Sequence, residues 1–298
     1  MDKVLFKGIM PALITPMDED GHIKTKIVAK LMGWLISEGC SGFYLCGATG
    51  EGVVMQPEDR MQLAEAAVEA AGGRVDLIDH IGAVDLKTAV KLARHAGEVG
   101  MDAISSVPPF FYGYGEKEIA QYYKAIAEAS GLPVIMYASP LAGTKITWEM
   151  VDRLMDIDGM VGVKWTNYDY FEMHRIKQLR GGNINVINGP DETLLCGLSM
   201  GADGGIGTTY NVMPKVFMNI YRYFTSGDIN AAQKEQFKAD KLIALLCRFN
   251  VLSAMKELLF MMGYDCGYCT YPLNRLTMEE RKAFRSGLDS LHFEEEYL

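Results

Sequence analysis

A lysine follows a short apolar run in the stretch VGVKWTNYDY, residues 161–170. The run at 161–163 predicts a buried strand, and Lys164 stands at its end. A buried ammonium group is costly unless it is paired or neutral. Lys164 is therefore either an ordinary strand-end lysine, ion-paired or snorkelling, or an amine kept desolvated to form a Schiff base with a carbonyl.

Other residues that could take part in such chemistry also stand at the ends of apolar runs. Tyr137 ends the run in PVIMYASP, and Thr208 follows the run in GGIGTTYN. The glycine-rich turn CGATGEG at 46–52 can present consecutive N–H groups to a carboxylate. Asp191 and Glu192 in NGPDETLL have two interpretations. They stand either at the start of a helix, where the helix dipole stabilises acidic residues, or in a polar binding site. Their convergence favours the Schiff-base interpretation of Lys164.

The elements that must position these residues alternate along the chain. Apolar runs are separated by amphipathic stretches such as KIVAKLMGWLISEG, a pattern that predicts strands followed by helices. The runs lie at 8–14, 42–46, 77–81, 103–107, 134–137, 161–163, 186–188 and 204–206. Eight such pairs predict an α/β fold, a (β/α)8 TIM barrel, in which chemistry occurs at the carboxyl ends of the strands. A doubly wound open sheet is the alternative, but the first turn lacks its GxGxxG sequence.

The pattern becomes helical only after residue 226. No linker rich in Pro, Gly or Ser divides the chain at this point. We therefore expect a barrel over residues 1–226 and a C-terminal helical extension over residues 227–298 that packs on the barrel.

Composition limits the classes of partner. The 298 residues carry a net charge of −9, which argues against nucleic-acid and anionic-membrane binding. No apolar run approaches the ~20 residues of a membrane span, and MDKVLFKGIM does not resemble a signal peptide, so we expect a cytoplasmic protein. The six cysteines are expected to be free thiols, including the pair in CGYC at 266–269. No histidine has metal-ligand spacing, so no metal site is predicted.

The whole chain resembles the pyruvate-dependent class I aldolases of the dihydrodipicolinate synthase / N-acetylneuraminate lyase family. The resemblance rests on GATGE at 47–51, Tyr137, GVK ending in Lys164, and GADGGIG at 201–207. It implies the TIM barrel, Lys164 and Tyr137 as catalytic residues, no metal or organic cofactor, and a homotetramer.

Three segments resemble the lyase branch of that family more than the synthase branch. They are Lys164-Trp165-Thr166, Gly189-Pro190-Asp191-Glu192 and GTTYN at 207–211. The arginine that synthases carry shortly after the tyrosine is absent from residues 138–143. The resemblance then implies reversible cleavage of N-acetylneuraminate, a sugar acid, to N-acetylmannosamine and pyruvate. The implied substrate-binding residues are Ala48, Thr49, Gly50, Thr166, Gly189, Asp191, Glu192, Gly207 and Thr208.

Two positions depart from the lyase pattern. Ala48 stands where the lyases usually have a serine, and Phe111 stands where the family donates a tyrosine to a neighbouring subunit, with Tyr112 as a possible substitute. Two alternative functions stay open. One is another pyruvate aldolase of the family, acting on a 2-keto-3-deoxy sugar acid or making 4-hydroxy-tetrahydrodipicolinate. The other is a catalytically silent barrel that binds a keto acid.

Overall fold

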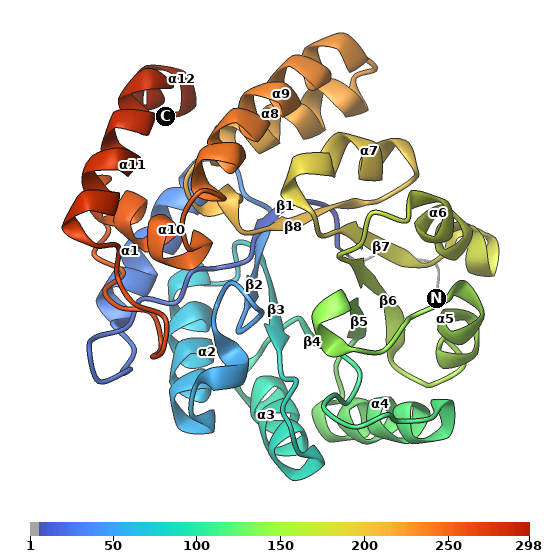
Figure 1. Ribbon diagram of the computed structural model, residues 1–298. Coiled ribbons are helices and arrows are strands. Elements are labelled where there is room, and N and C mark those ends of the chain that lie inside the picture. Colours follow the sequence, from blue (N-terminus) through green and yellow to red (C-terminus); the bar gives the residue numbers. More distant parts are fainter. Residues whose placement is uncertain (1–5) are drawn as a thin grey trace.

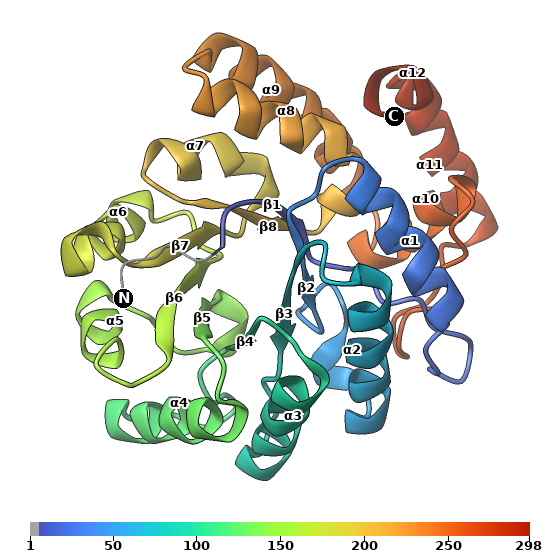
Figure 2. The ribbon, with the colours of Figure 1, turned by 180° about the vertical axis from the view of Figure 1, so that it is seen from behind.

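The computed structural model describes residues 6–298, apart from the side chain at position 141. Residues 1–5, the first half of the N-terminal segment MDKVLFKGIM, lie outside this range. Eight parallel strands follow one another in the order β1-β8-β7-β6-β5-β4-β3-β2. A bridge between Ala12 and Tyr44 joins the β1 and β2 ends of this sheet, so the strands form a barrel. Figures 1 and 2 show the barrel from its two ends, ringed by helices. The predicted TIM barrel is confirmed.

All eight predicted strands are present, each within a few residues of the expected bounds. They are β1 (Gly8–Pro11), β2 (Gly42–Leu45), β3 (Asp76–His80), β4 (Ala103–Ser106), β5 (Val134–Ala138), β6 (Met160–Trp165), β7 (Asn185–Asn188) and β8 (Gly204–Gly207). Strand β6 is longer than its apolar run and includes Lys164 and Trp165. In the pairing of β5 with β6, Tyr137 lies opposite Lys164, so the two side chains are neighbours on the same face of the sheet.

One helix follows each strand. These helices are α1 (Thr25–Ser37), α2 (Pro57–Ala71), α3 (Leu86–Val99), α4 (Glu116–Ser130), α5 (Trp148–Leu154), α6 (Tyr170–Gln178), α7 (Leu194–Ser199) and α8 (Pro214–Thr225). Side-chain caps mark the start of two of these helices. The Asp85 side chain accepts a hydrogen bond from the Thr88 N–H at the start of α3, and the Asp169 side chain accepts one from the Glu172 N–H at the start of α6.

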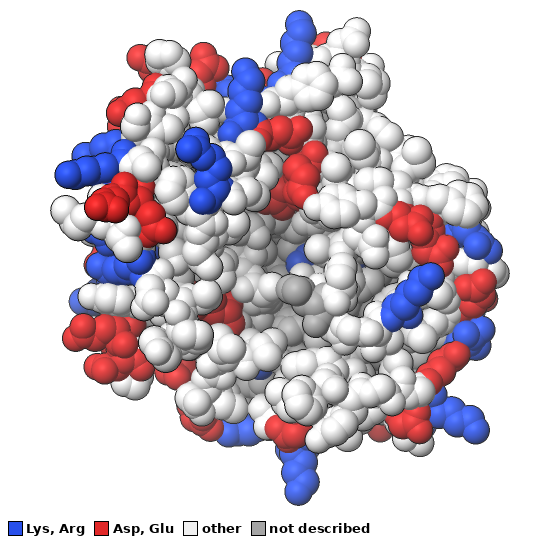
Figure 3. Space-filling view, viewed as in Figure 1, with Lys and Arg blue, Asp and Glu red and all other residues white. Residues whose placement is uncertain are grey.

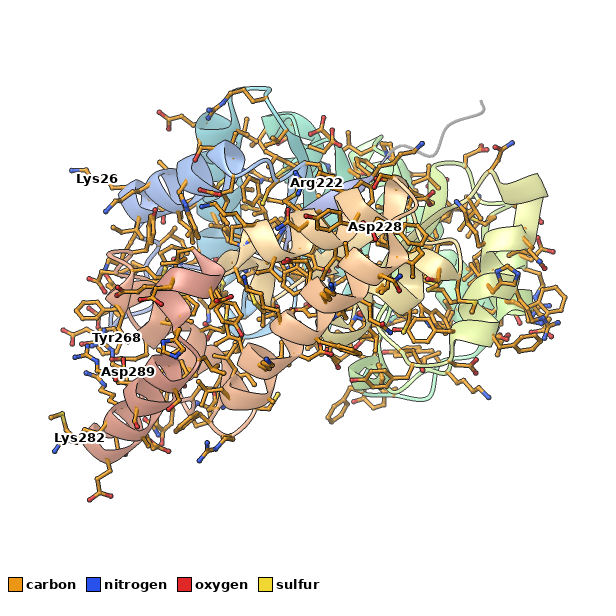
Figure 4. All side chains as sticks on the ribbon, turned by 90° about the horizontal axis from the view of Figure 1, so that it is seen from above. Lys26, Arg222, Asp228, Tyr268, Lys282 and Asp289 are labelled. Atoms are coloured by element: carbon orange, nitrogen blue, oxygen red, sulfur yellow. The ribbon has the colours of Figure 1, made fainter. Side chains whose placement is uncertain are left out.

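The C-terminal part is helical, as predicted. It contains α9 (Ile229–Leu246), α10 (Val251–Met261), α11 (Met278–Ser290) and α12 (Phe293–Tyr297). Helix α9 packs along α8 and also contacts α10 and α11, and α12 contacts α11 (Figure 1). Seen from above, α11 with Lys282 and Asp289 projects from the barrel on the same side as Tyr268 (Figure 4). The division of the chain between residues 226 and 227 stays a prediction.

Three further observations concern residues 6–298. No helix in this range is long and apolar enough to cross a membrane. No group of three or more His, Cys, Asp or Glu side chains in it is placed to hold a metal ion. All six cysteines are free, and Cys266 is buried whereas Cys269 is partly buried.

Candidate active site

Lys164 is buried inside the barrel, with 5% of its surface exposed. Its Nζ lies 4.0 Å from the centre of the Tyr137 ring and 4.3 Å from the centre of the Tyr44 ring. None of the ion pairs formed within residues 6–298 includes this amine. The ion-paired interpretation of Lys164 therefore does not apply, and the aromatic faces are its principal neighbours.

The Tyr137 phenol has an altered acidity. Burial acts to raise the pKa of Tyr137, but the nearby Lys164 charge and the polar side chains of Thr166, Ser139 and Lys164 outweigh burial and lower this pKa below its ordinary value. A phenol that ionises more readily and touches an amine is suited to accept and return a proton.

Tyr44 and His80 complete the surroundings of the amine, and sequence reasoning missed both. The Tyr44 hydroxyl donates to Ser105 Oγ at 2.9 Å. The His80 ring lies edge-on to Tyr137, with 5.8 Å between ring centres. No motif marks either residue, but His80 ends β3 and Tyr44 is the last residue but one of β2, so their place at a strand end is the signal that could have found them.

His80 is neutral. Burial, together with the Arg60 and Lys164 charges, lowers the pKa of His80 to about 3. The Val107 N–H donates to Nε2 at 3.3 Å, so Nδ1 carries the proton and donates to the Cys46 carbonyl at 3.0 Å. The imidazole therefore fixes the turn at Cys46 and adds no charge beside Lys164.

The glycine-rich turn places unpaired backbone donors at the cavity. Among the backbone hydrogen bonds of residues 6–298, none uses the N–H of Ala48 or Thr49. Ala48 is exposed, and Thr49 Oγ1 lies 2.6 Å from Thr208 Oγ1. These two amides and the hydroxyl pair can together hold a carboxylate. Gly50 is buried behind the turn, where its carbonyl accepts from Thr15 Oγ1 at 2.7 Å.

Asp191 and Glu192 form the polar side of the cavity. Asp191 Oδ2 accepts from both the N–H and the hydroxyl of Thr209, each at 2.6 Å. Burial raises the pKa of Asp191 to about 6, against the effect of these hydrogen bonds. A side chain at Gly207 would place its Cβ 2.1 Å from Asp191 Oδ1, so Gly207 makes room for this carboxylate. The Tyr168 hydroxyl donates to Glu192 Oε1.

These strand ends surround one cavity of about 400 Å³. It contains the predicted residues Ala48, Thr49, Tyr137, Lys164, Thr166, Gly189, Asp191, Glu192 and Thr208 in its lining, whereas Gly50 and Gly207 lie behind it. Sequence reasoning missed Ala12, Tyr168, Ile243, Cys247 and Val251, which also line it. In the space-filling view the molecule is hollowed at the centre of this face, with acidic side chains at the upper margin (Figure 3).

A second, mostly apolar cavity of about 300 Å³ adjoins the first at Ala48, Tyr137 and Ser139. Phe110 lines it, but Phe111 and Tyr112 line neither cavity. Both are exposed, by 83% and 68%, and Phe111 has a left-handed backbone with φ of 81°.

The fold and the cavity together define a (β/α)8-barrel protein with a buried amine at the carboxyl ends of its strands. The model of the dihydrodipicolinate synthetase family matches residues 5–291. The chain belongs to this family, and the resemblance seen in its motifs is confirmed.

Several named relatives are similar to this chain over most of its length. It is 36% identical to the N-acetylneuraminate lyase of Citrobacter koseri over 258 residues, 86% of each chain. It is 33% identical to the N-acetylneuraminate lyase of Rhizobium meliloti over 282 residues, which is 95% of this chain and 94% of that one. Its structure is similar to that of a catalytic lysine mutant of a sialic acid aldolase from Ruminococcus gnavus, with a TM-score of 0.94 and 28% identity over 98% of both chains.

Proposed function

We propose that this protein is a class I aldolase that cleaves N-acetylneuraminate reversibly to N-acetylmannosamine and pyruvate. The observation that carries the proposal is the Lys164 amine, which is buried between two phenol rings and has no carboxylate partner. A buried amine in this environment is suited to attack a carbonyl. The lyases and the sialic acid aldolase that resemble this chain support the choice of substrate.

The first half of the reaction forms the Schiff base. The neutral Lys164 amine attacks the C2 ketone of the open-chain sugar acid, and loss of water gives a protonated imine. The substrate carboxylate binds the free N–H groups of Ala48 and Thr49 and the Thr49 hydroxyl. This contact orients C2 toward the amine.

The second half breaks the C3–C4 bond. Tyr137, helped by the substrate carboxylate, accepts the proton of the C4 hydroxyl, and the C3–C4 electron pair moves into the imine to give a neutral enamine. The aldehyde N-acetylmannosamine leaves. Protonation of the enamine at C3 and hydrolysis of the imine release pyruvate and restore Lys164. The lysine supplies the electron sink, so no metal or organic cofactor enters the proposed mechanism.

The polar side of the cavity accounts for the preference for a sugar acid. Asp191, Glu192, Thr166 and Thr208 position the hydroxyl chain and the N-acetyl end in this proposal, beside Gly189. Residues 138–143, which follow Tyr137, contain no arginine to hold the second carboxylate of a synthase substrate.

Borohydride reduction in the presence of pyruvate tests the mechanism. Because borohydride reduces an imine to a stable amine, we expect a covalent adduct on Lys164, which mass spectrometry of the digested protein locates. Lys164→Met is the matched control and is expected to take up no adduct. An adduct on another lysine, or none on active protein, would overturn the mechanism. A folded protein with neither an adduct nor cleavage activity would favour a silent keto-acid-binding barrel.

A substrate comparison separates this proposal from other pyruvate aldolases. We expect cleavage of N-acetylneuraminate to exceed that of 2-keto-3-deoxygluconate, and condensation of pyruvate with aspartate semialdehyde to be negligible. The opposite ranking would assign the protein to another branch while leaving the role of Lys164 intact.

The assembly and the location are also part of the proposal. The family resemblance supports a homotetramer, and a cytoplasmic location is proposed with it. Light scattering during gel filtration measures the molar mass, for which we expect four times 33.0 kDa.

A further inference from the structure

A buried ion pair lies directly behind the carboxylate-binding turn. Glu51 follows this turn, and its Oε1 lies 2.9 Å from Lys256 Nζ in α10. The two side chains are 1% and 3% exposed. Neither Lys256 nor its helix takes part in the mechanism proposed above, and the two residues are far apart in the sequence.

The pair also forms hydrogen bonds with the backbone of the segment that follows α10. Glu51 Oε2 accepts from the Thr270 N–H at 2.6 Å, and Lys256 Nζ donates to the Tyr268 carbonyl. The same segment reaches the loop after β1, where the Tyr268 N–H donates to the Met17 carbonyl at 3.1 Å. Figure 4 shows Tyr268 at the side of the molecule where the C-terminal helices lie. Glu51 is thus the point at which the C-terminal segment holds the turn.

The backbone at Glu51 makes this contact relevant to the turn. Glu51 has a left-handed conformation, with φ of 58°, which a residue with a side chain adopts only when its surroundings hold it. The Glu51 N–H donates to the Ala48 carbonyl at 3.2 Å. The Ala48 carbonyl and the Thr49 N–H belong to one peptide plane, so this hydrogen bond links the backbone of Glu51 to the direction of the Thr49 N–H.

Charge gives Lys256 a second effect on the turn. Glu51 is two residues from Thr49, and an unpaired carboxylate there would repel a substrate carboxylate bound at the turn. Replacing a buried ion pair by apolar residues is often neutral or stabilising, so such a pair is weak evidence of a purely stabilising role. Lys256 cancels the Glu51 charge and fixes the Glu51 geometry at the same time.

We propose that Lys256 is a positioning residue for the carboxylate-binding turn at 47–50 and acts through Glu51. The inference rests on the proposed function. It adds the C-terminal helices to the determinants of pyruvate binding, although they lie outside the barrel.

The test measures adduct formation at Lys164 over a range of concentrations of two ketones. Pyruvate has a carboxylate for the turn to bind, and acetone has none. For Lys256→Met we expect the half-saturating pyruvate concentration to rise by about tenfold or more, because a hydrogen-bonded contact with a charged ligand is weakened. The adduct yield at saturating pyruvate is expected to stay unchanged, and so is the dependence of adduct formation on the acetone concentration.

Two control variants accompany Lys256→Met. Lys256→Arg keeps the charge and is expected to retain most of the pyruvate affinity. Lys24→Met removes a lysine whose Nζ pairs at 2.6 Å with Asp265 in the same segment, at 27% and 50% exposure, and is expected to leave both ketones unaffected. If Lys256→Met fails to fold, the double variant Glu51→Gln/Lys256→Met leaves no unpaired charge, and the same selective loss of pyruvate affinity is expected.

Three outcomes overturn the inference. A folded Lys256→Met or double variant with an unchanged half-saturating pyruvate concentration shows that the pair does not position the turn. Equal losses for pyruvate and acetone show general damage around Lys164. A wild-type protein that forms no adduct with pyruvate overturns the proposed function, and this inference with it.

Discussion

At the scale of single residues, the candidate site combines one amine with phenols and a neutral imidazole. Lys164 and Tyr137 each stand one residue before the end of a strand, and Thr208 follows β8; such positions can be found in a sequence. Tyr44 and His80 also stand at or next to a strand end, but no motif around them singles them out as site residues. Their effect on Lys164 depends on where the barrel brings the strands together.

Ala48→Ser adds a hydroxyl at an exposed position that lines the cavity. A hydrogen bond to a charged group contributes roughly 1.5–3 kcal/mol, and the free amides of the turn already carry most of the carboxylate contact. We therefore expect the lower end of that range, about a tenfold fall in the pyruvate KM. Because the contact exists in the ground and transition states alike, kcat should change little. Steady-state kinetics check this, and an unchanged KM with a large rise in kcat would assign the serine to proton transfer instead.

Tyr168→Phe removes the hydroxyl that donates to Glu192 Oε1 at the rim of the cavity. Without it, Glu192 loses one of its fixed contacts and the substrate loses a neighbouring hydroxyl. We expect the KM for N-acetylneuraminate to rise by about three- to tenfold, the range of one hydrogen bond. The half-saturating pyruvate concentration in borohydride trapping should not change. Tyr271→Phe, also an exposed tyrosine but outside the cavity, is the matched control. Equal effects of the two substitutions would contradict a role for Tyr168.

At the scale of elements, the strands were predictable to within a few residues because each is a short apolar run. The structure extends β6 through Lys164 and Trp165, which the apolar run alone did not include. The rim residues Ile243, Cys247 and Val251 were not predicted, since they belong to α9, its end and α10. Nothing in a helical pattern indicates which of its residues reaches a cavity in another part of the chain.

Thr277→Ala tests a helix whose start the structure defines fully. Thr277 and Glu280 form a capping box at the start of α11, with each side chain bonded to the backbone N–H of the other. Loss of such a cap typically lowers the free energy of unfolding by about 1 kcal/mol. We expect this loss in a urea titration, together with unchanged kcat and KM, since α11 does not line the cavity. Thr277→Ser keeps the hydroxyl and should restore the stability; a large loss of activity would show that α11 supports the site.

At the scale of the whole molecule, two buried carboxyl groups ionise near the same pH. Burial raises the pKa of both Asp79 and Asp191 to about 6. In the folded chain the pKa of each carboxyl group lies above its ordinary value of 3.8, so each holds its proton up to a higher pH. Each therefore contributes to the free energy of unfolding most fully below pH 3.8, and this contribution is lost as the pH rises through about 6.

Activity should depend on Asp191 in the opposite sense to stability, because activity should decrease as the pH falls. If ionised Asp191 accepts a substrate hydroxyl, kcat/KM for N-acetylneuraminate falls as the pH drops below about 6. Thr209→Val removes the hydroxyl that donates to Asp191 at 2.6 Å, so the pKa of Asp191 rises and the acid limb moves to higher pH. Asp79→Asn is the control and should leave the limb in place. A limb that moves with Asp79→Asn but not with Thr209→Val would assign this ionisation to Asp79.

The placement of α9 and α10 has a consequence for the order in which this protein is synthesised. A nascent chain that has completed all eight strands still lacks Ile243, Cys247 and Val251 at the rim of its cavity. It also carries the Glu51 carboxylate without the Lys256 ammonium group. Full affinity for pyruvate is therefore acquired only in the last stage of translation. Products of premature termination before residue 251 would have all eight strands but an incomplete cavity rim and an unpaired Glu51.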